Sequence, residues 1–511
     1  MMSILTKKRR KVSVGQAVQA MIVNALGFSG RALYLNTRFY ESRPVEVLVG
    51  EGLSAHDLHD SSLGTALDAI YEYGITELFF SVASKILAQR GIKTRFSHLD
   101  STTFSLHGVY NSEASDIPEG VIHITKGHSK DRAPELNQVV VQLICANKSS
   151  IPVWLEALSG NTSDKKSFPK TVREFQRQFD RNSMPYMVMD SAFYSKTNLV
   201  DCKEFRWVTR VPETLKEVKE HYGRIDRQRM RPIGGGYRYL PVKSRYAGIE
   251  QRWLIVYSEH AYEREMKTLR KNLEKRRDRN EKDLKHLRNQ GFACEADAVA
   301  AAERFQKQLR YQRLGYEIVG REYYSGKGRP KRDAKPESRK WFIAGTLSDE
   351  EQEIADVERR KGMFVVGTNE LDSEIFGDEE LIAVYKDQGH TVERGFRFLK
   401  DPMFYAESLY LKLPERIMAL IMVMTLSLLI YSLAEMRVRE ALEKSDSHIW
   451  DQKKRETKRP TIRWVFTIFE DVLLLYGITP QGVFRQSMNI REEHRVILRC
   501  LGPAYEKMYF L

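Results

Sequence analysis

The stretch Lys93-Thr-Arg-Phe-Ser-His-Leu-Asp100 alternates in strand-like fashion and closes on an aspartate. Such alternation is typical of a β-strand with one buried face. A second, shorter apolar run, Tyr186-Met-Val-Met-Asp190, also closes on an aspartate. We therefore predict two strands that each carry a carboxylate at the end. A serine follows both aspartates, and Asp-Ser suits a turn or cap, so a plain capping role is the alternative.

The segments around these two strands predict an α/β sheet. The order is several strands, a helix, a strand, a helix and a strand, which implies a sheet with some antiparallel members. Further strands are predicted at 103–110, 121–125, 136–145, 151–158 and 205–210, and helices at 164–179, with Asp164 as the cap, and at 195–204.

The rest of the chain divides into regions of different character. We expect a helical N-terminal domain at 1–90, a small unit of a kind that suits DNA binding, and a first part of the α/β core at 91–211. An insertion at 212–360 combines strands, a charged helical hairpin with a break near Gly291, and a basic loop from Ser325 to Pro336. The second part of the core is expected at 361–440 and a helical C-terminal region at 441–511.

Composition indicates an anionic partner. The 511 residues include 82 Lys and Arg against 68 Asp and Glu, a net charge of +14. Nucleic acid is the leading candidate because Lys and Arg make most phosphate contacts. A solvated basic surface is the alternative. The basic start, Met1 to Lys11, has three interpretations: a nucleic-acid arm, a nuclear localisation signal or a frayed basic terminus.

Two protein classes are disfavoured. The 4 cysteines are far apart and form no Cys-x-x-Cys pair, which argues against a zinc ribbon or a disulfide framework and fits a reducing cytosol. The apolar run from Ile417 to Ala434 reaches only the short end of the membrane-spanning range, so we predict a buried helix of a soluble protein.

A third carboxylate lies in the helix-like stretch from Tyr385 to Lys400. On a helical period Glu393, Arg397 and Lys400 share one face, and an adjacent apolar stripe can pack on the sheet. The alternative is an ordinary exposed Glu-Arg pair four residues apart. Together with Asp100 and Asp190, however, Glu393 completes a set of oxygen ligands that suits a pair of Mg²⁺ ions in phosphodiester chemistry.

Two weaker signals accompany these carboxylates. Gly127-His-Ser-Lys-Asp-Arg132 combines a turn with two cations, and Lys130 and Arg132 are candidates to grip a DNA backbone; a plain polar loop is equally compatible. His98, His107, His123 and His128 match no metal-ligand spacing, so separate polar roles are preferred over a zinc or iron site.

From about residue 60 to 470 the chain resembles bacterial insertion-sequence DDE transposases of the insertion-sequence-four superfamily, especially its sixteen-thirty-four branch. The landmarks are His98-Leu-Asp100-Ser-Thr-Thr, Gly127-His-Ser-Lys-Asp-Arg132, Gly160-Asn161 with Asp164, Met189-Asp190-Ser-Ala-Phe-Tyr194, Gly367-Thr-Asn369 and the stretch from Tyr385 to Lys400. In the family's tyrosine, arginine, glutamate and lysine signature, Tyr385, Glu393 and Lys400 match. Gln388 stands at the arginine place, and the gap to the glutamate is one residue longer; Arg397 is a candidate to share the arginine role with Gln388.

The resemblance implies an RNase H-like mixed-sheet core with Asp100 on its first strand, Asp190 after its fourth strand and Glu393 on a late helix. It implies a cut-and-paste transposase that cleaves element ends with two Mg²⁺ ions, or Mn²⁺ in their place, and joins the 3′-OH to target DNA. Tyr385, Gln388, Arg397 and Lys400 would bind DNA. A homodimer on DNA in the bacterial cytoplasm, associated with the nucleoid, is expected. The alternatives are an RNase H-like nuclease without strand transfer and a catalytically silent, transposase-derived DNA-binding protein.

Overall fold

The structure, a computed structural model, describes residues 11–27, 35–110, 117–146, 150–180, 183–325, 335–401 and 411–510. All but the last residue of the basic N-terminal stretch lies outside the described residues, as does most of the predicted basic loop after Ser325. The chain forms two compact units. The first comprises Met1–Thr209, Arg245–Gln251 and Thr368–Leu511, and the second comprises Arg210–Ser244 and Arg252–Gly367.

The first unit begins with helices, as predicted for its N-terminal part. These are α1 (Val14–Leu26), α2 (Asn36–Tyr40), α3 (Val45–Leu48), η2 (Ala55–Leu58), α4 (Asp60–Tyr73) and α5 (Ile75–Arg90). A capping box explains where α1 starts, since Ser13 Oγ accepts from the Gln16 amide and Gln16 Oε1 accepts from the Ser13 amide. Gly91 in a left-handed conformation ends α5.

A mixed sheet forms the centre of the first unit. Five strands of this nine-stranded sheet run in the order β3-β2-β1-β4-β5, and their bounds are β1 (Phe96–Leu106), β2 (Asn137–Ala146), β3 (Ile151–Ser159), β4 (Tyr186–Met189) and β5 (Trp207–Val211). β1 pairs antiparallel with β2, and β2 with β3, whereas β1 pairs parallel with β4, and β4 with β5. The predicted mixture of strand directions is confirmed, and the fold is mixed α/β.

Two strand predictions are wrong in detail. The runs at 93–100 and 103–110 form one continuous strand, β1, so Asp100 lies within a strand and not at its end. The segment 121–125 forms no strand, because only Thr125 makes a single bridge, to Gln138. In the first case pairing along β2 extends β1 beyond the point where the sequence pattern suggested a turn.

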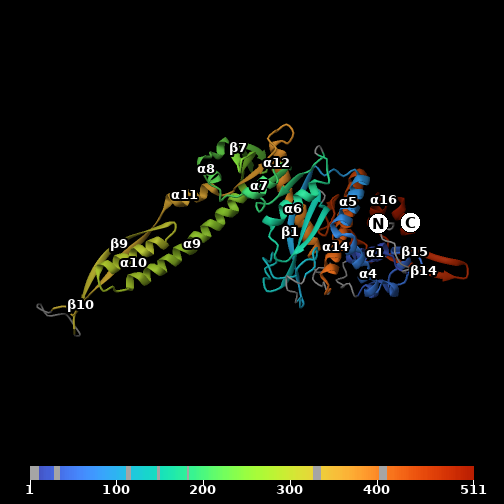
Figure 1. Cartoon of the computed structure of the whole chain (residues 1–511), viewed down its shortest axis with the longest axis horizontal. Helices are drawn as coiled ribbons and strands as arrows, with labels where there is room; N and C mark the ends of the chain where they lie inside the picture. The colour runs from blue at the N-terminus through green and yellow to red at the C-terminus, as the bar shows by residue number, and fades with distance from the viewer. Residues whose placement is uncertain are drawn as a thin grey trace. The chain divides into compact units, whose positions relative to one another are not determined.

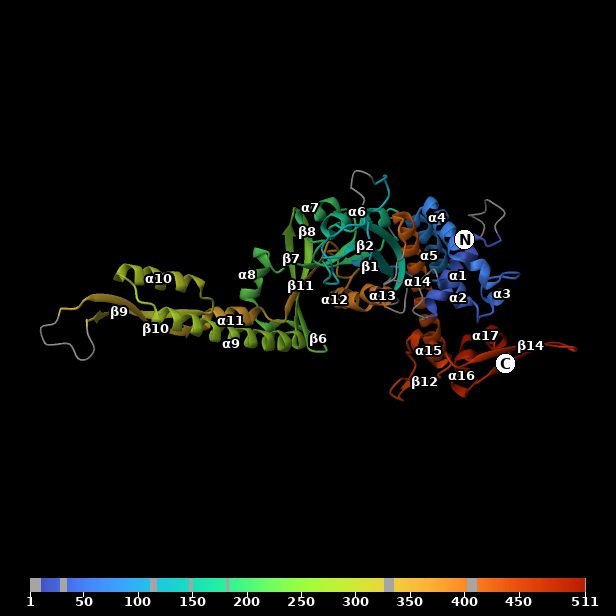
Figure 2. The ribbon, with the colours of Figure 1, turned by 90° about the horizontal axis from the view of Figure 1, so that it is seen from below.

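The remaining helices between the first strands and the C-terminal part are α6 (Asp164–Gln176), α7 (Lys196–Asp201), α12 (Asp378–Lys386), η5 (Asp387–His390), α13 (Val392–Leu399) and α14 (Pro414–Lys444). α5 and α14 lie against β3, α13 lies against β1 and β2, and α12 lies against β4. α14 is apolar and long enough to cross a membrane, but 83% of its apolar window is buried inside the protein, as predicted. It also contacts α1, α4 and α5 (Figure 2).

The C-terminal part of the first unit is not wholly helical, contrary to the expectation for 441–511. It contains β12 (Ile449–Trp450), β13 (Glu456–Thr457), α15 (Ile462–Ile468), β14 (Leu473–Thr479), β15 (Gly482–Met488), α16 (Glu492–Leu501) and α17 (Pro503–Met508). β14 and β15 form an antiparallel hairpin. The turn between them contains Pro480 and ends at Gly482, which has φ +132°, and both residues disfavour a continuous helix there.

The second unit combines strands with long charged helices, as predicted for the insertion. Its elements are α8 (Lys216–Arg224), η4 (Arg227–Arg229), β6 (Arg231–Gly234), β7 (Tyr237–Tyr246), β8 (Ile249–Ser258), α9 (Glu259–Asn289), α10 (Glu295–Gln308), β9 (Gln312–Tyr323), β10 (Ser338–Asp349), α11 (Glu351–Arg360) and β11 (Met363–Thr368). α9 and α10 are the two helices of the predicted hairpin, and both pack on the β9–β10 ribbon (Figure 1).

One buried ionic cluster attaches α13 to the rest of the first unit. Glu435 on α14 has a side chain only 5% exposed and pairs with Arg394 of α13 and, at 2.7 Å, with Arg439. Its other oxygen accepts from the Ile462 amide at the start of α15. A ring contact between Phe398 and Tyr431, with centroids 4.4 Å apart, adds a second point of attachment.

We predict that Glu435→Gln lowers the free energy of unfolding by about 3 kcal/mol, because two partly buried arginines lose their counter-charge. The measurement is urea unfolding of the full chain, followed by circular dichroism. Glu440→Gln, at an exposed position of the same helix, is the control and is expected to change stability by no more than about 0.5 kcal/mol. Equal unfolding midpoints for the two variants would contradict this role of Glu435.

Candidate active site

Asp100 and Asp190 lie side by side on neighbouring parallel strands. The register of β1 and β4 pairs His98 with Val188; Asp100 follows two residues later within β1, and Asp190 two residues later, beyond the end of β4. Asp190 comes directly after β4, as predicted, and its carbonyl accepts from Thr209 Oγ1 at 2.7 Å. The Ala192 amide donates to its carboxylate at 2.9 Å. The parallel pairing therefore places two carboxylates at one point of the sheet.

The environment of both aspartates disfavours negative charge. Burial raises the pKa of Asp100 to about 6; Lys130 and the Ser101 amide oppose this rise, whereas Asp190 and Asp164 add to it. Burial also raises the pKa of Asp190, and Asp164 raises it further. Buried carboxylates that repel one another gain stability from a bound cation, so this pair has the chemistry of a metal ligand set.

Asp164 is a third carboxylate that the sequence did not identify as part of the site. It was expected to cap a helix, but Ser163 is the N-cap residue of α6 and Asp164 is its first residue. Its carboxylate accepts from Ser101 Oγ and, at 3.0 Å, from Lys130 Nζ. The resemblance landmark of Gly160-Asn161 with Asp164 drew attention to this position without giving the carboxylate a role in the site.

Lys130 lies at the centre of these contacts. Its Nζ donates to Ser101 Oγ at 2.6 Å and to the Ser101 carbonyl at 2.8 Å, and it lies 3.9 Å from Asp100 Oδ1. Its backbone amide donates to Thr103 Oγ1 at 3.1 Å. Lys130 therefore neutralises charge beside the aspartates from a loop that is attached to β1.

Two glycines allow this loop to approach the sheet. A Cβ on Gly127 would lie 2.1 Å from the Gly160 carbonyl oxygen, and a Cβ on Gly160 would lie 2.1 Å from the Gln138 carbonyl oxygen. No side chain fits at such distances. Gln138 Nε2 completes the junction by donating to the Gly160 carbonyl at 2.6 Å. Close backbone packing thus fixes the start of the loop that carries Lys130.

α13 reaches the same side of β1 through Lys400. Lys400 forms an ion pair with Asp131, the residue after Lys130, and its Nζ lies 5.8 Å from the centre of the Phe104 ring. Phe104 and Asp100 are four residues apart on β1 and therefore point to one face of the sheet. Lys400 is thus on the face that carries Asp100.

Glu393 is exposed on the first turn of α13, and the predicted apolar stripe of that helix is buried, with Val392 at 0%, Phe396 at 6% and Leu399 at 1% exposure. Arg397 is exposed and lines a cavity of about 430 Å³ together with Phe398, Tyr431 and Arg463.

The other predicted DNA contacts lie near α13 or on the loop. Tyr385 is half-buried near the end of α12, and Gln388 lies in the 3₁₀ turn η5 between α12 and α13. Arg132 is exposed, two residues after Lys130.

Among the described residues, no group of three or more His, Cys, Asp or Glu side chains could by itself hold a metal ion. His98, His107, His123 and His128 therefore form no such group either.

We predict that Asp100→Asn stabilises the metal-free protein at pH 7 by up to about 3 kcal/mol. The folded protein holds the Asp100 proton up to a pKa of about 6, against 3.8 ordinarily, so stability falls as pH rises through that window. Asparagine does not titrate. Urea unfolding in EDTA at several pH values measures the difference, which should disappear below about pH 4. A constant difference across this range would rule out the effect.

Two family models match the sequence. The model described as a domain of unknown function (DUF4277) matches residues 2–84, and the model described as a transposase DDE domain matches residues 92–430. No curated protein sequence matches significantly.

Solved structures show only distant likeness. A piggyBac transposase synaptic complex with hairpin DNA is 10% identical, with a TM-score of 0.36, over 98% of this chain and 80% of that chain. A Mos1 transposase paired-end complex with the left transposon end is 8% identical, with a TM-score of 0.15, over 40% and 60%. Because the transposase DDE domain model covers more than half of the chain, this protein belongs to the DDE family of DNA transposases.

Proposed function

We propose that this transposase works by cut-and-paste: it binds element ends, hydrolyses the phosphodiester bond there, and joins the freed 3′-OH to target DNA. The observation that carries the proposal is the alignment of Asp100 and Asp190 on two parallel strands. Both ends must be cut together, so the active form is proposed to be a homodimer on DNA.

The catalytic core is proposed to be RNase H-like. Three antiparallel strands followed by two parallel ones, in the order β3-β2-β1-β4-β5, support this assignment. The N-terminal helices would bind element ends, and the second unit would be an insertion between the second and third catalytic carboxylates.

Asp100, Asp190 and Glu393 are proposed to hold two Mg²⁺ ions, for which Mn²⁺ could substitute. When bound, such a pair clamps the attacking and leaving oxygens of the phosphodiester. The pKa of both aspartates is raised first by burial and then by neighbouring carboxylates, and a bound cation would offset both effects, which supports a cation at this place.

The position of α13 supports Glu393 as the third carboxylate. Glu393 and Lys400 are seven residues apart, two helical turns, and therefore share one face of α13. Lys400 lies on the Asp100 side of β1, paired with Asp131. The Arg394–Glu435 pair fixes the rotation of the helix next to Glu393.

The surrounding cations have two proposed tasks. Lys130 would hold Ser101 and Asp164 beside Asp100 and balance the carboxylate charge. Arg132, Tyr385, Gln388, Arg397 and Lys400 would orient DNA phosphates or a displaced base. Lys130 was also a candidate DNA ligand, but its contacts to Ser101 and Asp164 favour the positioning task.

We predict that Asp100→Ala, Asp190→Ala and Glu393→Ala each abolish Mg²⁺-dependent cleavage of DNA that carries the element's ends, because each removes a proposed metal ligand. Binding of the same DNA in EDTA should persist. Glu379→Ala, at an exposed position of α12, is a control that should still cleave. Full cleavage by any one of the three variants would remove that residue from the site.

The products of the same reactions separate the alternatives. Joining of the cut end to a plasmid supports the transposase mechanism, and cleavage without joining indicates a nuclease. DNA binding without any cleavage indicates a silent, transposase-derived binding protein.

A further prediction distinguishes the proposed positioning role of Lys130 from the proposed DNA-binding role of Arg132. Lys130→Ala should lower the cleavage rate at saturating DNA by on the order of 100-fold, since misplacement of a catalytic group by about 1 Å has effects of that size. Arg132→Ala should mainly weaken DNA binding. Rates and dissociation constants of both variants provide the test, and a Lys130→Ala defect confined to binding would refute the positioning role.

A further inference from the structure

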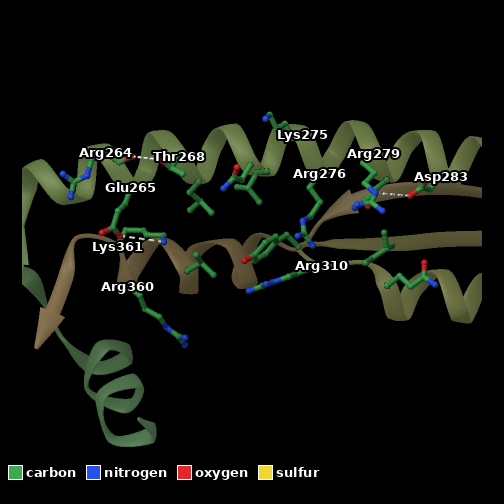
Figure 3. Close-up of a pocket in the computed structure, with 18 of the residues that line it drawn as sticks. Arg264, Glu265, Thr268, Lys275, Arg276, Arg279, Asp283, Arg310, Arg360 and Lys361 are labelled. Atoms are coloured by element: carbon green, nitrogen blue, oxygen red, sulfur yellow. Dashed lines mark hydrogen bonds and ion pairs between the residues drawn. The ribbon is translucent and has the colours of Figure 1, made fainter. Parts of the chain in front are cut away.

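The second unit contains a strongly basic groove that the catalytic site does not use. The groove is a cavity of about 970 Å³ formed by α9, the segment after α10 and the end of α11. Arg264, Arg276 and Arg279 come from the long helix α9, and Arg310 and Arg360 come from the opposite side (Figure 3).

The charges of this groove are unbalanced. Seven Lys and Arg side chains line it, against three Asp and Glu side chains. Two of the acids face cations of the groove, Asp283 at 3.9 Å from Arg279 and Glu265 at 3.8 Å from Lys361. Within the described ranges the other five cations have no ion pair: Arg264, Lys275, Arg276, Arg310 and Arg360. An excess of positive charge in a concave surface attracts an anion.

The sequence of α9 explains why these cations face the groove. The apolar stripe Met266, Leu269 and Leu273 is buried against Tyr311 and against residues of α11. A polar stripe with three- or four-residue spacing runs alongside, from Arg264 through Thr268 and Asn272 to Arg276 and Arg279. Packing of the first stripe therefore directs the second stripe into the groove.

Tyr311 holds two of the cations in place. The guanidinium of Arg310 lies 4.8 Å, and that of Arg276 lies 5.9 Å, from the centre of its ring. The Tyr311 amide donates to Glu353 Oε2 at 2.9 Å, which fixes the backbone at this sharp turn. Guanidinium groups oriented in this way lose less side-chain entropy when they bind phosphate.

We propose that this groove binds the sugar-phosphate backbone of duplex DNA, independently of base sequence, at a place separate from the catalytic carboxylates. The inference rests on the proposed function, which brings DNA to the protein. From Arg264 to Arg279 the polar stripe of α9, which carries three arginines, extends about 22 Å along the helix. That length suits a polymer with several phosphates on one strand better than a free nucleotide.

The test measures binding of the full chain to a fluorescent duplex of random sequence, in EDTA, over a series of salt concentrations. Arg264→Ala with Arg276→Ala removes two cations of the groove. Arg270→Ala with Lys271→Ala removes the same charge from exposed positions of the same helix that do not line the groove. Both double variants retain strong helix formers on α9, and Arg264→Lys with Arg276→Lys keeps the charge.

We expect the groove variant to bind on the order of tenfold more weakly, with a slope of log affinity against log salt shallower by about 2. The lysine variant should retain most of the wild-type affinity, and the Arg270 and Lys271 variant should retain the wild-type slope. Equal losses in both alanine variants would mean that net charge alone acts, and would overturn the proposal.

A competing partner class is tested in the same assay with fluorescent polyglutamate. If the groove variant loses polyglutamate binding but keeps duplex binding, the groove serves an acidic protein and the DNA proposal fails. Because the assay contains no metal, it does not depend on cleavage. A wild-type protein that binds DNA through the groove but never cleaves it would defeat the proposed function and leave this inference standing.

Discussion

The candidate active site depends first on the parallel pairing of β1 with β4. That pairing, and no local motif, brings Asp100 and Asp190 together from positions 90 residues apart in sequence. A one-residue slip would turn one of the two side chains to the other face of the sheet. The antiparallel pairing of β1 with β2 holds β1 from its other edge, so the position of Asp100 is fixed on both sides.

Part of this arrangement could be predicted from the sequence, because it depends on local pattern. Apolar runs indicated β2, β3 and β4, helical periodicity indicated the buried stripe of α13, and the charged stretch indicated α9 and α10. The strand order could not be read from these patterns, since pairing depends on contacts between distant segments. The hairpin of β14 and β15 was missed because its leucine-rich first strand has no alternation that separates strand from helix.

The charged residues around the aspartates also depend on contacts between distant segments, which the sequence pattern does not reveal. Asp164 lies 63 residues from Ser101 and 34 from Lys130, yet its carboxylate contacts both side chains. Sequence alone assigned it to a helix cap, because capping is the commonest role of aspartate before a helix. The contact with Lys130 depends on the close approach of Gly127 to Gly160, which brings the Lys130 loop to the sheet.

Glu393 and Arg394 are adjacent on α13. The ion pair of Arg394 with Glu435 attaches α13 to α14, and the attached helix carries Glu393. The rotation of this helix is therefore set by its contact with α14, downstream, and not by counting residues from Tyr385. The extra residue that separates Gln388 from Glu393 falls around the 3₁₀ turn η5 and the residues that join it to α13. Insertions there can lengthen the signature without changing the rotation of α13, so a search that demands fixed spacing between tyrosine and glutamate would overlook relatives in which the helix is held in the same way.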